Sequence, residues 1–144
     1  MQNKPEKRIV DFFNEHHVLT LATSVNNQSY CSNCFYSYIA DENIFVFSSD
    51  EDTRHIIEAK QNPNVAASIV LETKTIGKIQ GTQIIGEIEE AIGDRLKLVK
   101  KAYLKQFPYA ILKNTKLWIL NISYIKMTDN RLGFGKKLIW EASI

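Results

Sequence analysis

Runs of strand-forming residues, separated by very short polar breaks, constrain this fold more than any other sequence feature. The first three runs follow one another between residues 17 and 49. The expected strands are His17–Val25, Tyr30–Ala40 and Ile44–Ser49, and the breaks are Asn26-Asn27 and Asp41-Glu42-Asn43. Strands in short succession, without a regular β-α-β alternation, favour an antiparallel barrel over a parallel sheet. We therefore expect a mainly β protein, an antiparallel β-barrel with flanking helices.

The rest of the chain continues this pattern and adds helices. Further strands are expected at Val65–Leu71, Lys78–Glu89 and Leu117–Thr128, with bends or bulges at Gly81 and Gly86, and the tract Leu132–Trp140 closes the chain. Helices are expected from Pro5, from Asp50 to Gln61, and from Asp94 to about Gln106, the last with Leu96, Val99, Tyr103 and Phe107 on one face. The sequence has no linker, repeat or low-complexity stretch. About six strands and three helices are thus expected to form one domain over residues 1–144.

Charge and composition exclude some classes of function. The chain is 44% apolar and 24% charged, as in a globular domain. Its 18 basic and 16 acidic residues give a net charge of +2, without the basic face that broad nucleic-acid binding needs. No segment is apolar enough to cross a bilayer, and the N-terminus lacks the apolar run of a signal peptide. The sequence therefore predicts a cytoplasmic protein that binds neither nucleic acid nor membrane.

Two pairs of potential metal ligands have simpler explanations. Cys31 and Cys34 have the spacing of half a zinc site, but residues three apart in a strand point to opposite faces. Packing is the better explanation, and no metal site is expected. His16-His17 lies at the end of the first expected helix, where a positive imidazolium is favoured. A role as haem ligand for one of these histidines is kept as an alternative.

The most informative stretch is residues 47–55, FSSDEDTRH. It passes from a strand end through hydroxyls into a helix start, where free N–H groups and the helix dipole bind phosphate. Arg54 would add a bidentate contact and Thr53 a hydroxyl. The alternative is structural: Thr53 or Asp52 caps the helix, and Arg54 pairs with Asp50 or Asp52, whose charges would repel a phosphate. The residues alone leave these two interpretations even.

A second candidate lies near the C-terminus. Gly133-Phe134-Gly135 is not a dinucleotide fingerprint, because the third glycine and the flanking strand and long helix are missing. The glycines would let the backbone approach a ligand closely, and Lys136 and Lys137, which follow, suit an anionic one. On these residues alone, a solvated charged turn is favoured.

Longer tracts resemble a known superfamily. IFVFSS, followed by TRHIIEAKQNPNVAASI, resembles the third strand, helix and fourth strand of the pyridoxamine-5′-phosphate-oxidase-like superfamily, whose members bind FMN in a split β-barrel. The order of elements agrees over nearly the whole chain, including the glycine in the strand segment Ile84-Ile85-Gly86-Glu87. KAYLKQFPYA and IKMTDNRLGFGKKLIW are similar to a small subfamily of short bacterial proteins known only through this relationship.

The resemblance implies a set of FMN-binding residues. The Ser-Arg-Lys phosphate motif of the family falls on Thr53, Arg54 and His55, with a histidine in place of the lysine. The hydroxyl-bearing strand end of the family falls on Ser48 and Ser49. These five residues are the expected phosphate side of the site.

The resemblance also places residues around the flavin ring. The family's arginine on the preceding strand falls on Asn33, and Cys34 and Phe35 would flank the ring edge. The family's glutamine falls near Gly81, so Gln80 or Gln83 would supply it, and Lys136 and Lys137 lie where a partner subunit's C-terminal tract approaches the flavin. The resemblance therefore implies a homodimer with FMN between two barrels.

The expected function is a flavin-dependent oxidoreductase of unknown substrate. No side chain stands out as a general acid or base, and the basic residues that hold the substrate phosphate in the oxidase have no match here. Pyridoxamine phosphate oxidation is therefore not expected. The alternatives are a non-catalytic flavin carrier or sensor, and a haem-binding protein on the same fold.

The aromatic content is large for so short a chain, which favours an apolar dimer interface. The residues concerned are Phe12, Phe13, Tyr36, Tyr38, Phe45 and Phe47.

Overall fold

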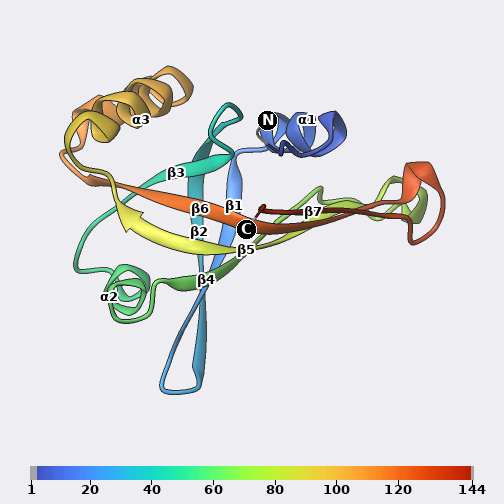
Figure 1. Ribbon diagram of the computed structural model, residues 1–144, viewed down its shortest axis with the longest axis horizontal. Coiled ribbons are helices and arrows are strands. Elements are labelled where there is room, and N and C mark those ends of the chain that lie inside the picture. The colour runs from blue at the N-terminus through green and yellow to red at the C-terminus, as the bar shows by residue number, and fades with distance from the viewer. Residues whose placement is uncertain (1–2, 144) are drawn as a thin grey trace.

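The computed structural model describes residues 3–143, which form seven strands and three α-helices (Figure 1). In chain order they are α1 (Lys7–Glu15), β1 (Val18–Val25), β2 (Gln28–Ile39), β3 (Ile44–Ser49), α2 (Arg54–Gln61), β4 (Asn64–Val70), β5 (Gln80–Glu90), α3 (Gly93–Gln106), β6 (Lys116–Asp129) and β7 (Lys137–Glu141). Short 3-10 turns lie at Ile76–Lys78, Pro108–Leu112 and Asn130–Leu132. Six of these strands and all three α-helices were expected from the sequence, with bounds that differ by up to four residues. The strand β7 lies in the closing tract Leu132–Trp140, which was not assigned to a strand.

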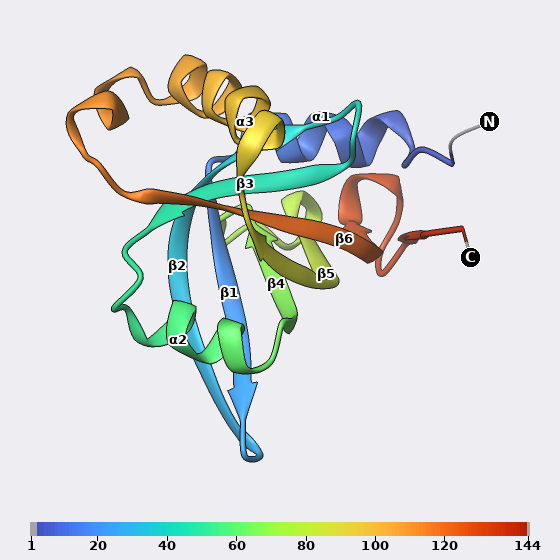
Figure 2. The same ribbon diagram turned by 60° about the vertical axis from the view of Figure 1, so that its left-hand side comes forward.

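The strands form one antiparallel sheet that closes on itself. Its order is β3-β2-β1-β4-β5-β6-β7, and β3 also pairs with β6 along its whole length. The closed part therefore contains β1 to β6, and β7 continues the sheet beside β6. Figure 2 shows β3 and β6 crossing above β2, β1 and β4. The predicted mainly β, antiparallel split barrel is confirmed.

The core lies inside the barrel, and α1 covers one end of it. Alternate side chains of each strand point inward, and Ile9, Phe12 and Phe13 of α1 join them. Five of the six aromatic residues assigned above to a dimer interface are in this core. They are Phe12, Phe13, Tyr36, Phe45 and Phe47, each at most 2% exposed. That argument for a dimer was therefore wrong, because these rings are buried within one subunit.

A second apolar layer holds α3 against the outside of the barrel. Val99 and Tyr103 are buried against β3 and β6, for example against Val46. Leu96 and Phe107 pack against the same cluster, which confirms the predicted apolar face of this helix. This layer positions the C-terminal half of α3 beside the end of β3.

Several element ends differ from the sequence expectation. α1 begins at Lys7, two residues after Pro5, and α2 begins at Arg54 because residues 50–53 form a turn. The N-cap of α3 is Ile92, so Asp94 does not cap the helix. Asp94 lies in the first turn instead, where a carboxylate suits the positive end of the helix dipole.

Glycines and asparagines shape the turns. Asn26 and Asn27 both adopt positive φ, as a two-residue hairpin turn requires. The expected bulge at Gly86 is present, and a Cβ there would overlap the carbonyl oxygen of Asn121. The last strand begins at Lys137, because residues 130–136 form a turn in which Gly133 and Gly135 have positive φ.

Candidate functional site

The end of β3 and the start of α2 bring four of the predicted site residues together. The chain turns after Ser49, and the Thr53 hydroxyl donates a hydrogen bond to the Asp50 carbonyl at 2.8 Å. Thr53 is thus the N-cap residue by position, but its side chain bonds backwards along the turn and does not cap the helix. No acidic residue lies in the first turn of α2, so its first N–H groups face no carboxylate of their own helix.

His55 is the polar centre of this junction. Its Nε2 lies 2.8 Å from Ser49 Oγ and 3.5 Å from Thr53 Oγ1. Burial lowers the pKa of His55, so the imidazole is neutral near pH 7. It therefore contributes a hydrogen-bonding nitrogen in place of the positive charge that a lysine would bring. We call Ser49, Thr53, Arg54 and His55 the junction cluster.

Cys34 lies on the inner side of β2, close to this cluster. It is buried, whereas Cys31 is exposed, so the two thiols point to opposite faces as predicted. Burial raises the pKa of the Cys34 thiol to about 11, which keeps it protonated and a poor nucleophile. Nearby, the indole N–H of Trp118 donates to the Ser49 carbonyl at 2.9 Å and fixes the end of β3.

Arg54 pairs with a residue that the sequence analysis did not consider. Its Nε donates to Glu58 Oε2 at 2.6 Å, and its guanidinium lies over the Tyr30 ring, 4.1 Å from the centroid. The expected partners Asp50 and Asp52 were therefore wrong. The spacing of four residues on one helix face is the signal that could have found Glu58. The Nε contact leaves the two Nη groups of Arg54 able to donate to another anion.

Ser48 points away from the junction cluster, because adjacent strand residues face opposite sides. Its hydroxyl contacts that of Thr115, below α3. On the outer side of β2, Tyr103 Oη donates to the Phe35 carbonyl at 3.4 Å. The Phe35 ring is 57% exposed and stacks parallel to His17, with ring centroids 6.2 Å apart. The two serines thus mark two neighbouring surfaces.

The outward side of β2, β1, β4 and β5 carries no charged side chain at twelve adjacent positions. Asn33 contacts Thr20 at 2.9 Å, and pairing between the strands continues this row through Ser68 to Gln83. Phe35, Val70 and Ile85 are more than half exposed. We call the set the uncharged face: Val18, Thr20, Ala22, Cys31, Asn33, Phe35, Ala66, Ser68, Val70, Gly81, Gln83 and Ile85.

Other predicted residues lie far from the junction cluster within one subunit. Ser49 pairs with Lys116 at the start of β6, whereas Gln80 pairs with Asp129 at its end. These two ends of β6 are thirteen positions apart, which is roughly 40 Å along an extended strand. Gln83 pairs with Lys126 and Lys137 with Thr128, and Lys136 lies in the adjoining turn. Within one subunit these side chains therefore do not join the junction cluster.

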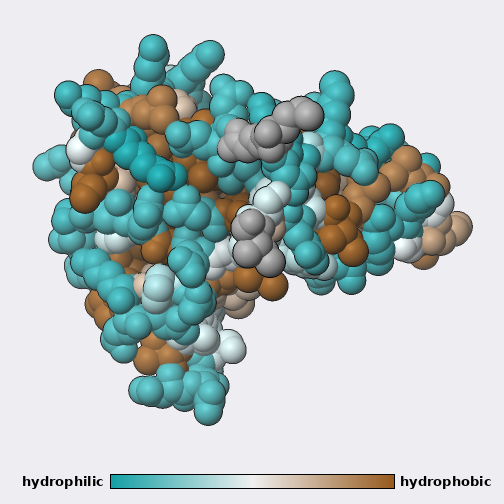
Figure 3. Space-filling model, viewed as in Figure 1, coloured by the Kyte–Doolittle hydropathy of each residue, from teal (hydrophilic) through white to brown (hydrophobic). Residues whose placement is uncertain are grey.

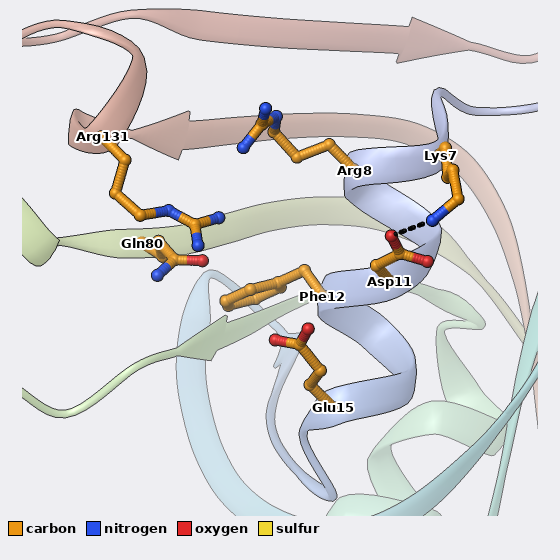
Figure 4. A pocket seen from close by; sticks show the side chains of 7 residues that line it. All are labelled: Lys7, Arg8, Asp11, Phe12, Glu15, Gln80 and Arg131. Carbon is orange, nitrogen blue, oxygen red and sulfur yellow. Dashed lines mark hydrogen bonds and ion pairs between the residues drawn. The ribbon is translucent and has the colours of Figure 1, made fainter.

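Gln80 instead lies in a cleft of about 400 Å³ between α1 and the ends of β5 and β6 (Figure 4). Beside it, the buried carboxylate of Asp129 accepts hydrogen bonds from Arg131 Nη2 at 2.9 Å and from Arg8 Nη1 at 3.2 Å. The Arg131 guanidinium lowers the pKa of Asp129. Sequence reasoning missed this group, because 121 residues separate Arg8 from Asp129 and no local pattern connects them.

Metal ligands do not gather in the described part of the chain. Within residues 3–143, no three side chains of histidine, cysteine, aspartate or glutamate come together as a metal site would require. His16 packs on Phe12 with ring centroids 4.3 Å apart, and burial lowers its pKa, which contradicts the expected imidazolium there. In the same range, no helix has the length and apolarity to span a membrane.

Comparison with known proteins shows a sequence family and a fold. No protein-family model matches the chain. A UPF0306 protein of Photorhabdus laumondii is 42% identical over 125 residues, which are 87% of this chain and 87% of that protein. A haem-binding protein from Mycobacterium smegmatis has a TM-score of 0.76 at 17% identity over 91% of this chain and 56% of that chain. A FAD-binding protein from Mesorhizobium loti has a TM-score of 0.69 at 15% identity over 83% of this chain and 91% of that chain. The two structural likenesses establish the fold alone.

Proposed function

The chain belongs to the UPF0306 family, and because this family name states no activity, we propose a function from the site itself. The proposed function is binding of FMN between two copies of the chain, as a flavin-dependent oxidoreductase of unknown substrate. Bound FMN would supply the redox chemistry, and the protein would hold it and control access to it.

The observation that carries this proposal is the junction cluster. It combines the free N–H groups of a helix start, the hydroxyl of Ser49 and the two uncommitted Nη groups of Arg54, whereas the Thr53 hydroxyl donates to the Asp50 carbonyl. These donors suit the phosphate of FMN. The neutral His55 suits a phosphate less well than a lysine would. A bound phosphate would raise the pKa of His55, and the protonated imidazole would then pair with it. The Mesorhizobium loti neighbour, which binds a flavin, supports the same ligand class on this fold.

The uncharged face supports the dimer. In a chain with 24% charged residues, a sheet surface of twelve exposed or half-buried residues without a charge is unusual. Interface centres are depleted in charge, and the exposed apolar residues Phe35, Val70 and Ile85 add surface of the kind that marks an interaction site. A second copy on this face would also explain how Gln83, which is part of it, could reach the flavin of a partner.

The test is a titration of the purified protein with FMN, followed by flavin fluorescence and the visible spectrum. We expect saturable binding of one FMN per subunit, and much weaker binding of riboflavin, which lacks the phosphate. Steady oxidation of NADH or NADPH by the loaded protein would support turnover, and its absence would support a carrier or sensor. No binding of FMN at micromolar concentrations would contradict the proposal.

Haem binding is a second candidate, because His17 is exposed beside an apolar surface. His17 stacks on Phe35, and Val18 next to it is 39% exposed, so an imidazole and an apolar platform lie together. The Mycobacterium smegmatis neighbour binds haem. In the same spectra, a Soret band that is lost in His17→Ala would favour haem over FMN.

A further inference from the structure

A cavity of about 330 Å³ lies under the C-terminal half of α3, next to the end of β3. Its walls come from α3, from the segment 110–115 and from the first residues of β6. A cavity of about 150 Å³ is enough for benzene, so this one has room for two fused rings with a small polar group. We call it the α3 cavity.

The wall of the α3 cavity is mixed, with polar groups beside apolar side chains that are partly uncovered. Its apolar part includes Leu104, Ile111, Leu112 and Leu117. Ile111 is 70% exposed and Leu112 is 82% exposed. Figure 3 shows apolar side chains between polar ones in the region of α3. A ligand with an apolar body would remove this surface from water, which favours binding.

The charges at the α3 cavity have one sign. Lys100 and Lys113 line it, and among the described residues that line it none is acidic. Neither lysine forms an ion pair within residues 3–143. Four other cavities of this protein each have a carboxylate in their walls, including Glu15, Glu42, Glu51 and Glu90. The two free cations therefore favour an anionic group on the ligand.

The α3 cavity adjoins the proposed flavin site without being part of it. Ser48, whose hydroxyl faces the cavity, is the neighbour of Ser49 in the junction cluster. Tyr103 lines the cavity and donates to the Phe35 carbonyl, where the flavin ring edge is expected. A molecule in the cavity would thus lie beside the cofactor.

We propose that the α3 cavity binds the substrate, and that this substrate is an amphipathic carboxylate with an aromatic or similarly flat apolar body. Its carboxylate would lie between Lys100 and Lys113, and its body against Leu104 and Leu117. The role as substrate site rests on the proposed flavin function, whereas binding of the carboxylate does not.

The test uses naphthalene-2-carboxylate as probe and naphthalene-2-carboxamide as its neutral match, both titrated by calorimetry. We expect the carboxylate to bind the parent protein, and the amide to bind at least about tenfold more weakly. The double variant Lys100→Gln/Lys113→Gln should lose about tenfold or more in affinity for the carboxylate. Lys97→Gln, which removes an exposed lysine of the same helix outside the cavity, should bind as the parent does. Ala110→Phe, which fills the cavity, should abolish binding.

Each titration is repeated with FMN to separate the two proposals. We expect these variants to bind FMN as the parent does, and saturating FMN to leave the affinity for naphthalene-2-carboxylate unchanged or higher. The proposal is overturned by equal binding of the amide, by an unaffected double variant, by no binding to the parent, or by competition with FMN. Carboxylate binding without FMN binding would overturn the substrate role together with the proposed function.

Discussion

At the scale of single residues, Arg54 is the sharpest test of the proposed phosphate site. Its two Nη groups would fork two phosphate oxygens, which is a strong charge-assisted contact. We expect Arg54→Ala to weaken FMN binding by about ten- to more than a hundredfold. Riboflavin should bind the variant and the parent about equally. Flavin fluorescence titrations of both ligands against both proteins measure this difference.

Glu58 provides the matched control for Arg54. Glu58→Gln removes a negative charge beside the expected phosphate, and its amide oxygen can still accept from the Thr23 hydroxyl. This variant should bind FMN at least as tightly as the parent. If Arg54→Ala binds FMN normally, the phosphate lies elsewhere. If Arg54→Ala unfolds the flavin-free protein, the contacts of Arg54 with Glu58 and Tyr30 are structural.

The sequence predicted the residue-scale contacts only in part. The opposite directions of Cys31 and Cys34 followed from the two-residue period of a strand. The period also puts Ser48 and Ser49 on different sides, although the resemblance had assigned both to one phosphate site. Arg54 has four acidic residues within four positions in the sequence, three before it and Glu58 after it. Only the helix start at Arg54 itself decides in favour of Glu58.

At the scale of elements, Asp129 joins α1 to the end of β6. Its side chain is fully buried, and its carboxylate forms ion pairs with Arg8 and Arg131. Asp129→Asn should lower the free energy of unfolding by about 1–3 kcal/mol near pH 7, because hydrogen bonds to a charged group are lost. Asp11→Asn, which breaks the exposed pair of α1 with Lys7, should change it little. Urea unfolding of the three proteins measures both effects.

The contribution of the Asp129 carboxylate to stability should decrease as the pH is lowered. Because its pKa is lowered in the folded protein, its contribution is present above the ordinary pKa of an aspartate, about 4, and is lost as the pH falls through the folded value. The difference between parent and Asp129→Asn should therefore shrink in acid. An undiminished difference at low pH would mean that packing, and not the charge, explains the cost.

Element types were easier to predict than element ends. The sequence pattern identified six of the strands and the three α-helices, and Ile44–Ser49 even had the expected bounds. The tract GFGKKLIW was not assigned to a strand, and it contains both a turn, in which Gly133 and Gly135 take positive φ, and the strand β7 from Lys137. A glycine allows both conformations, so the sequence did not decide between them.

At the scale of the whole molecule, closure of the barrel decides which residues can share a site. The pairing of β3 with β6 joins segments about 70 residues apart, and it puts Trp118 beside Ser49. No local pattern encodes such a contact. The same topology sends Gln80 to the α1 cleft and leaves the lysines of residues 136–137 far along the sheet, so the sequence predicted the barrel better than the site.

The uncharged face gives the prediction for the assembly. If two copies pair through it, a charge at its centre would be buried without a partner, at a cost of several kcal/mol. Ser68→Arg should therefore raise the dimer dissociation constant by about a hundredfold or more and lower the flavin content, since each site lacks its partner. Gln61→Arg adds the same charge at the exposed end of α2 and should leave the dimer intact.

Light scattering at micromolar concentration measures the mass of the parent and both variants. A monomeric parent, or a Ser68→Arg dimer as tight as the parent, would show that this face does not pair two subunits. The flavin would then have to bind to the junction cluster of a single chain.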